Sequence, residues 1–166
     1  VVLVLDAPEP GGVIAGAGQF GTAEQGIFSY WTHAYAQKRP LKYIGFDGTG
    51  CQVRDGLHPD DLAELVSLQF QRRSDLAPRI FNVGGGVENA MSLAQLTSWC
   101  AQRFGNHRIE SDPTPRPFDV PWLVMDNQQT TAEFGWRPKR ALHSILEEIA
   151  NHAEQNPHWL DLSAPP

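Results

Sequence analysis

Short apolar runs alternate along the chain with longer segments in which apolar residues recur every three or four positions. The short runs are typical of buried strands and the longer segments of amphipathic helices. Strands are expected at 1–5, at 13–15, from 41 onward, at 51–57, at 80–83 and at 107–110. Helices are expected from 22 to before 40, after 59, from 92 to 105, before 135 and at 141–155. This alternation predicts an α/β fold in one domain, residues 1–166.

Residues at the expected helix ends support these boundaries. Thr22 and Gln25 match a capping box, as do Ser92 and Gln95. Pro59 suits the first turn of its helix, and the acidic pair that follows suits the positive end of the helix dipole. The side chains expected on the buried helix faces are Ile27, Phe28, Trp31, Ala34, Tyr35, Leu62, Leu65, Val66, Phe70, Leu93, Leu96, Trp99, Cys100, Phe104, Leu142, Ile145, Leu146 and Ile149.

The composition narrows the class of protein. With 166 residues, 41% hydrophobic residues and a formal net charge of −6, the chain is typical of a globular domain with its own core. Dispersed basic residues and a negative net charge argue against a nucleic-acid partner or an acidic membrane surface. The 2 cysteines favour a reducing cytoplasm, and no apolar run is long enough to span a membrane.

Arg54 is the first candidate for binding an anion. Alternation along the strand 51–57 places Gln52 and Arg54 together on a polar face, beside a Gly-rich turn. A guanidinium in that position is suited to form two parallel hydrogen bonds with a phosphate. The alternative interpretation is a surface arginine paired with Asp55 or Asp60.

Arg116 is the second candidate. It lies in 111–121, a Pro-rich loop in which no regular element is expected. Pro115 and Pro117 stiffen the backbone around it, which lowers the entropy lost when the side chain binds a ligand. Arg54 and Arg116 together suit a diphosphate, while the alternative that both are solvated surface charges stays open at this point.

Other motifs give weaker indications. The segment Gly16–Gly21 matches the G-x-G-x-x-G fingerprint of dinucleotide sites, but the helix is expected to begin only at Thr22, and Asp47 lies too far along the chain to be the ribose acid. His58 is interpreted as a helix cap or a packing residue. Neither cysteine has an activating neighbour, and Cys100 lies on an apolar helix face. The 6 histidines have no metal-ligand spacing, so no metal site is expected.

The order of several sequence blocks resembles the carboxyl-terminal half of the extended short-chain dehydrogenase/reductases, in the NAD-dependent epimerase/dehydratase group that acts on nucleotide sugars. The blocks are GAGQFG, RPLKYIGFDGTGCQVRDGLHPDDLAEL, RIFNVGGGVENAMSLAQL, PRPFD and MDNQQTTAEFGWRPKRALHSILEEI. Within this family, GQFGTAEQG, QVRD with LHPDD, and NVGGG with MSL most resemble the CDP-paratose 2-epimerase (CDP-tyvelose 2-epimerase) subgroup. The resemblance covers residues 12–150.

The resemblance implies a Rossmann-like fold, a nucleotide sugar as ligand, most of all a CDP-sugar, and NAD as the cofactor of the full-length enzyme. In that subgroup, NAD oxidises a sugar hydroxyl transiently and returns the hydride to the other face of the ketone, which converts CDP-paratose to CDP-tyvelose by inversion at C2. The resemblance implies diphosphate contacts from the two arginines, pyrimidine contacts from the strand that begins at Leu41, and a ribose contact from an acid. The implied substrate residues are Gln19, Lys42, Ile44, Arg54, Arg116 and Asp119, and the chain is expected to pass the nicotinamide at Gly12 and Val13.

The chain departs from that family in its catalytic parts. The dinucleotide fingerprint of the family's amino-terminal half is missing, and none of Tyr30, Tyr35 and Tyr43 has a lysine four residues later. We therefore assign no catalytic residue and expect no tight NAD binding by this chain alone. The expected partner is the missing amino-terminal Rossmann half, and an apolar patch left by its absence favours a homo-oligomer. Two alternatives remain: a non-catalytic module that binds a nucleotide diphosphate or a protein, and a sister nucleotide-sugar 4-epimerase or dehydratase.

Overall fold

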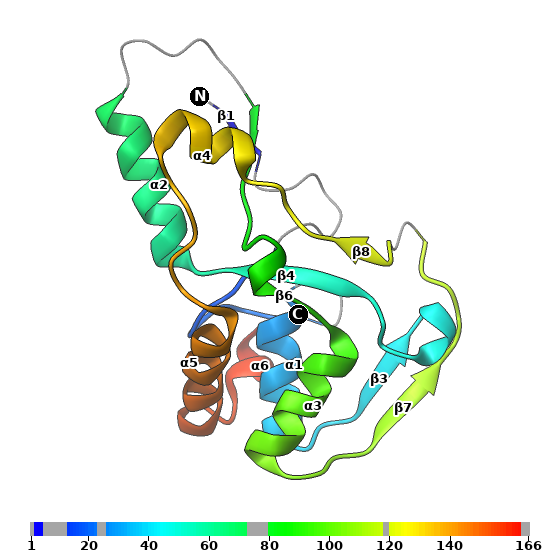
Figure 1. Cartoon of the computed structure of the whole chain (residues 1–166). Helices are drawn as coiled ribbons and strands as arrows, with labels where there is room; N and C mark the ends of the chain where they lie inside the picture. Colours follow the sequence, from blue (N-terminus) through cyan, green and yellow to red (C-terminus); the bar gives the residue numbers. More distant parts are fainter. Residues whose placement is uncertain (1, 5–12, 23–25, 73–79, 118–119, 164–166) are drawn as a thin grey trace.

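The computed structural model describes residues 2–4, 13–22, 26–72, 80–117 and 120–163. Its elements in chain order are β1 Val2–Val4, β2 Val13–Ile14, α1 Ile27–Ala36, β3 Leu41–Ile44, η1 Phe46–Gly48, β4 Val53–Leu57, α2 Pro59–Gln71, β5 Ile80–Asn82, η2 Val87–Asn89, β6 Ala90–Ser92, α3 Leu93–Phe104, β7 Ile109–Asp112, β8 Trp122–Leu123, α4 Gln128–Phe134, α5 Leu142–Gln155 and α6 Trp159–Ser163. The α/β class is confirmed. An upper part holds α2, α4, β1 and β5, a lower part holds the other long helices, and β4 runs between them (Figure 1).

β4 is the central strand of the fold. It pairs in parallel with β2, where Val13 lies opposite Gly56, and in parallel with β8, where Arg54 lies opposite Leu123. It also pairs antiparallel with β6, where Arg54 lies opposite Met91. Residues 54–57 are all buried, because strands pair along both edges of β4 and α5 and η2 pack against it. Arg54 is only 7% exposed, so the alternative that it is a solvated surface charge is wrong.

β3 and β7 form a separate parallel pair, with Leu41 opposite Ile109 and Ile44 opposite Asp112. β7 therefore continues into the segment 111–121, where no regular element was expected. That expectation is wrong for the first two residues of the segment, because pairing with β3 extends the strand up to the first proline.

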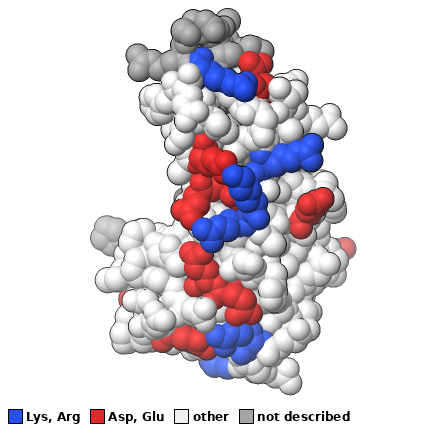
Figure 2. Space-filling view, turned by 60° about the vertical axis from the view of Figure 1, so that its left-hand side comes forward, with Lys and Arg blue, Asp and Glu red and all other residues white. Residues whose placement is uncertain are grey.

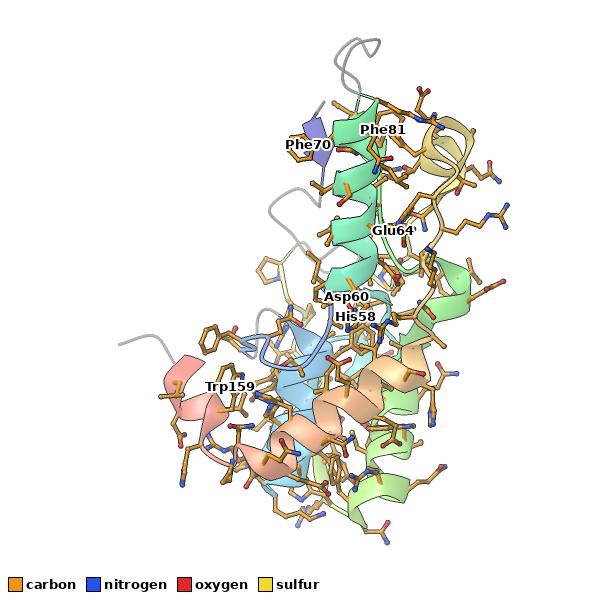
Figure 3. The ribbon with its side chains drawn as sticks, turned by 90° about the vertical axis from the view of Figure 1, so that its left-hand side faces the viewer. His58, Asp60, Glu64, Phe70, Phe81 and Trp159 are labelled. Carbon is orange, nitrogen blue, oxygen red and sulfur yellow. The ribbon has the colours of Figure 1, made fainter. Side chains whose placement is uncertain are left out.

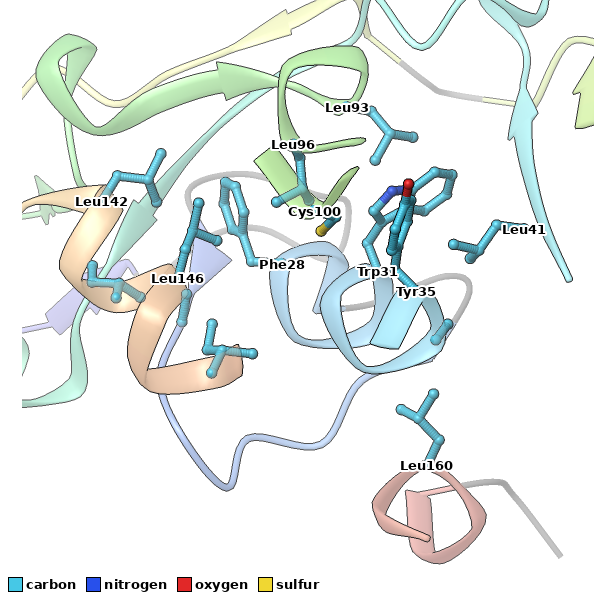
Figure 4. Close-up of a cluster of buried hydrophobic side chains, with 14 residues drawn as sticks. Phe28, Trp31, Tyr35, Leu41, Leu93, Leu96, Cys100, Leu142, Leu146 and Leu160 are labelled. Carbon is cyan, nitrogen blue, oxygen red and sulfur yellow. The ribbon is translucent and has the colours of Figure 1, made fainter. Parts of the chain in front are cut away.

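The main apolar core lies in the lower part, around α1 (Figure 4). Phe28, Trp31 and Tyr35 of α1 pack between Leu96 and Cys100 of α3 on one side and α5 on the other. The remaining buried members of this core are Ala15, Ala34, Leu41, Leu93, Leu142, Ile145, Leu146, Ile149 and Leu160. The inward faces predicted for α1, α3 and α5 are confirmed, with Trp99 and Phe104 partly buried at the edge.

A second, smaller apolar cluster lies in the upper part, where β1 pairs in parallel with β5 and α2 packs near α4. Its buried members are Leu57, Leu65, Phe81, Val83, Phe134 and Trp136. Phe70 was expected in this core but is 66% exposed, as is Ile80 on β5. Phe70 lies at the far end of α2 (Figure 3), where most of its side chain stays exposed. The prediction for Phe70 is therefore wrong.

The helix starts depend on different local contacts. The capping box at α3 is confirmed, with Ser92 Oγ accepting from the Gln95 amide at 3.1 Å and Gln95 Oε1 accepting from the Ser92 amide at 2.7 Å. Thr22 does not cap α1, because the helix begins at Ile27 after Gly26 in the left-handed conformation, φ 71°; Gln25 lies outside the described residues. A side chain on Gly21 would lie 2.6 Å from the Tyr30 amide, so the preceding loop folds directly over the helix start.

The start of α2 is as expected. Pro59 occupies the first turn, and His58 Nδ1 caps the helix by accepting from the Asp60 amide at 3.1 Å. Asp60 binds Arg140 at 2.7 Å, so it is not the partner of Arg54 that one alternative suggested. Asp61 is buried, and its Oδ2 accepts from the backbone amide of Arg140 at 3.0 Å. The first turn of α2 therefore anchors the segment that leads into α5.

Candidate functional site

An open pocket of about 220 Å³ lies between α1, β3 and the segment that precedes β4. Apolar and aromatic side chains form much of its wall, including Tyr30 and Trp31 from α1 and Ile44 from β3. Lys42, Gln52 and Arg116 complete the lining with polar groups. The pocket therefore combines flat apolar surface with cationic side chains, a combination suited to a nucleotide.

The polar side chains of the pocket differ in what they contact. Lys42 Nζ lies 3.3 Å from Glu110 Oε2, and both side chains are about half exposed. Gln52 Oε1 is buried and has no hydrogen-bond partner in the described part of the chain. Arg116 is exposed at the rim. The Gln52 oxygen is therefore an unsatisfied acceptor buried behind the pocket wall, which is costly for a polar atom.

Arg54 lies beside this pocket and does not line it. Its Nη1 donates to the carbonyl oxygens of Val53 at 2.8 Å and Val120 at 3.0 Å. It therefore joins β4 to the segment between Arg116 and β8. The structure brings Lys42, Ile44 and Arg116 together at one pocket, whereas Arg54 is outside its lining and donates to Val120, which follows Arg116 in the sequence.

The Gln19 loop, residues 16–21, does not form a dinucleotide fingerprint. α1 begins only at Ile27, so no helix start follows the glycines. The Ala17 amide donates to Glu148 Oε1 at 3.0 Å, which places a carboxylate where a pyrophosphate would need backbone donors. Gln19 Oε1 is buried and has no hydrogen-bond partner among the described residues. Val13 opens this region on β2, beside Gly56.

The triple glycine after β5 packs against Asp55. The Asp55 Oδ2 atom accepts from the Gly86 amide at 2.7 Å and from the Met125 amide at 3.3 Å, and the Gly84 amide donates to Asn127. Burial raises the pKa of the Asp55 carboxyl, although these amide donors oppose the shift. The glycine turn therefore has a structural role, because its Gly84 and Gly86 amides already donate to Asn127 and Asp55.

His58 is a structural residue. Its Nδ1 accepts a hydrogen bond from the Asp60 amide, so Nε2 carries the ring hydrogen and donates to Glu148 Oε2 at 3.1 Å. Burial raises the pKa of the Cys100 thiol to about 12, which makes it a poor nucleophile. No group of three or more potential ligands in the described ranges could hold a metal ion. None of the helices in those ranges is both long and apolar enough to cross a membrane.

Charged side chains on the face formed by α2 and α5 alternate in sign (Figure 2). Asp60 binds Arg140 at 2.7 Å, and Arg103 binds Glu154 at 2.8 Å. Positive groups on this face therefore lie beside negative ones and form no continuous basic surface. Such a face attracts nucleic acid poorly.

Some predicted site residues cannot be placed. Gly12 and Asp119 lie outside the described residues. Sequence reasoning interpreted Trp31 as a core residue, and the structure shows that it is both buried and part of the pocket wall. Tyr30 was not singled out as a site residue. The sequence feature that could have indicated Tyr30 and Trp31 was their position on the helix between the Gln19 loop and β3.

Comparison with known proteins identifies the family. CDP-paratose 2-epimerase of Salmonella typhi is 30% identical over 136 residues, which cover 75% of this chain and 37% of that protein. The chain belongs to the extended short-chain dehydrogenase/reductase family. UDP-glucose 4-epimerase of Corynebacterium glutamicum is 33% identical over 104 residues, 61% of this chain and 30% of that protein. No protein-family model matches the chain.

Solved structures of the family share the fold. The UDP-glucose 4-epimerase of Thermotoga maritima with UDP-glucose superposes with a TM-score of 0.72 at 22% identity, over 87% of this chain and 44% of that one. The UDP-glucose 4-epimerase of Thermus thermophilus in complex with NAD gives a TM-score of 0.70 at 24% identity, over 85% and 44%. The chain thus corresponds to the carboxyl-terminal part of these enzymes and spans less than half their length.

Proposed function

We propose that the chain binds the nucleotide part of a nucleotide sugar in the pocket between α1 and β3. The observation that carries the proposal is an apolar and aromatic wall that meets two cationic side chains, Lys42 and Arg116, around the buried oxygen of Gln52. The wall suits the face of a base, and the cations suit phosphates.

In this proposal the residues divide between the parts of the ligand. The backbone at Lys42 and Ile44 flanks the pyrimidine, and Arg116 binds the diphosphate. To act as the second diphosphate ligand, Arg54 must turn from its place beside the pocket, where it donates to the carbonyl oxygens of Val53 and Val120. Asp119 reaches the ribose, Gln19 contacts the sugar, and Gly12 and Val13 pass the nicotinamide of the complete enzyme.

The described residues do not fit NAD. No helix begins directly after the Gln19 loop, so the loop offers no helix amino terminus to a pyrophosphate. The Ala17 amide of the loop already donates to Glu148. We propose that NAD, the cofactor in the Thermus thermophilus structure, is bound by a Rossmann half that this sequence does not contain. No hydride step is therefore assigned to residues of this chain.

The upper part supports a Rossmann half as the partner. Parallel sheets are almost always covered on both faces and extend over several strands. In the described residues, β1 and β5 pair only with each other, and Ile80 on β5 is 66% exposed. This pair has the features of the edge of a larger parallel sheet. We propose that the rest of this sheet is formed by the part of the epimerase relatives that this chain does not cover.

We further propose that the complete enzyme acts as a CDP-paratose 2-epimerase, as the name of the Salmonella typhi relative suggests, and that it does so in the cytoplasm, which the small number of cysteines favours. A sister 4-epimerase is the second candidate, because the Corynebacterium glutamicum relative and both solved structures bear that name. The identity of the nucleotide separates them. CDP is expected to bind more tightly than UDP in the first case and less tightly in the second.

Isothermal titration of the chain with CDP, UDP, dTDP and GDP tests the proposal. Arg116→Ala should weaken binding of the preferred nucleotide about 10- to 100-fold, as expected when a hydrogen bond to a charged group is lost. Arg137→Ala is the matched control, because Arg137 is exposed and does not line the pocket. Failure of all four nucleotides to bind would favour a protein-binding module. Equal effects of the two substitutions would rule out Arg116 as a ligand.

A further inference from the structure

The Gln19 loop is held by side chains from three helices. Its Gln19 carbonyl oxygen accepts from Ser29 Oγ of α1 at 2.7 Å and from Trp159 Nε1 of α6 at 3.0 Å. Glu148 of α5 accepts from the Ala17 amide at 3.0 Å. The contact with Trp159 spans 140 residues of sequence, so the carboxyl-terminal helix reaches back to the start of the fold.

Ring contacts add to the Trp159 hydrogen bond. The indole stacks on Phe20 with ring centroids 4.8 Å apart and planes within 3°. Its other neighbour is His152 of α5, whose ring meets it edge-on at 4.7 Å. Phe20 is 57% exposed, so the stack with Trp159 covers apolar surface that would otherwise face water.

α6 is itself fixed in place, which makes it a support for the loop. Leu160 belongs to the main core, and Asp161 binds Arg39 at 2.8 Å just beyond α1. Trp159 therefore stands on a helix that packs against the same α1 that follows the Gln19 loop. Figure 3 shows Trp159 at the lower end of the molecule, well away from Phe70 and the far end of α2.

We propose that Trp159 is a positioning residue for the Gln19 loop. Its N–H and its ring hold the loop in the conformation from which the Gln19 side chain meets the sugar of the ligand. This inference rests on the proposed function for the contact between Gln19 and the sugar. The hold on the loop itself depends only on contacts within the chain.

Two substitutions separate the contributions of Trp159. Trp159→Phe keeps a ring against Phe20 and removes the N–H, whereas Trp159→Ala removes both. Trp99→Phe is the matched control, because Trp99 Nε1 also donates to a neighbour, His143 Nδ1 at 3.2 Å, but lies on α3. The measurements are amide hydrogen exchange of residues 16–22 and titration with CDP and with CDP-glucose.

Trp159→Phe should speed exchange in the Gln19 loop about fivefold, the factor for one neutral hydrogen bond of typical strength. It should weaken CDP-glucose by a similar factor and leave CDP unchanged, because only the sugar meets the loop. Trp159→Ala should have a larger effect on both loop exchange and CDP-glucose affinity, and Trp99→Phe should change neither of these two quantities. Loop exchange that is unchanged in Trp159→Phe, or equal losses for CDP and CDP-glucose, would overturn the inference. If the unsubstituted chain binds neither ligand, the proposed function and the sugar contact are refuted, whereas faster loop exchange still supports the hold.

Discussion

Replacing Asp55 should show how far one buried carboxylate holds the centre of the fold together. Asp55 is fully buried on β4, and its Oδ2 atom accepts from the amides of Gly86 and Met125. Asp55→Ala leaves two partly buried amides without this acceptor, at about 1–3 kcal/mol each if no water replaces it. The expected loss in the free energy of unfolding is therefore about 2–6 kcal/mol. Asp55→Asn keeps an acceptor oxygen and should cost about 1 kcal/mol.

The same carboxylate gives the stability a characteristic pH dependence. Burial raises the pKa of Asp55 in the folded state, so the folded chain holds this proton more tightly than the unfolded chain does. The contribution of Asp55 to stability is then largest at acid pH. It falls as the pH rises from the unfolded pKa, about 3.9, through the raised folded value, and it is constant above that value.

Urea unfolding of the unsubstituted chain and of Asp55→Asn, followed by circular dichroism from about pH 3.5 to about pH 8, measures both effects. The free-energy difference between the two should shift in favour of Asp55→Asn as the pH rises. Asp126→Asn is the matched control, because the exposed Asp126 also accepts from a backbone amide, that of Gln128 at 2.9 Å. A pH-independent difference for Asp55→Asn, or a loss below about 1 kcal/mol for Asp55→Ala, would show that the reasoning about this carboxylate is wrong.

Three further substitutions test other parts of the fold. Burial lowers the pKa of His33, although the hydrogen bond to the Ser29 carbonyl opposes this shift, so stability should fall as the pH drops below about 6.5, where the unfolded chain takes up a proton that the folded chain resists. Urea unfolding between about pH 7.5 and about pH 5.5 should show this slope, and His33→Gln should flatten it; an unchanged slope would contradict the assignment. Ser92→Ala should cost about 1 kcal/mol through loss of the α3 cap, whereas Ser98→Ala on the exposed face of the same helix should cost less. Gly84→Ala should destabilise the chain markedly in a thermal melt, because the added carbon would lie 2.5 Å from Met125 Cβ and 2.6 Å from Asp55 Oδ2; a melt like that of the unsubstituted chain would show that this turn can relax.

The helices were predicted best, for a local reason. α3 and α5 have long apolar faces, and Ser92 with Gln95 marks the start of α3 within four residues of sequence. Thr22 does not cap α1, which begins at Ile27, and the loop before the helix lies so that Gly21 approaches the Tyr30 amide, a contact that a local motif does not contain. β6 and β8 were missed because they have only three and two residues and are defined by pairing with β4.

The candidate site was predictable only in part. Alternation along β4 correctly placed Arg54 on a strand, but it cannot show that neighbouring strands and helices bury both faces. Lys42 and Arg116 lie far apart in sequence, and only the resemblance to the epimerase family suggested that they share a ligand. The pairing of β3 with β7 brings their segments to one pocket.

The pairing of β1 with β5 has a consequence for every measurement proposed above. A short parallel pair with Ile80 and Phe70 exposed nearby offers both backbone hydrogen bonds and apolar surface to a second molecule. If two copies associate through this edge, mass action makes the apparent free energy of unfolding rise with protein concentration. The free energy of unfolding and the ligand affinity of this chain should therefore be measured at several protein concentrations and extrapolated to infinite dilution. Light scattering should accompany each titration to report the oligomeric state.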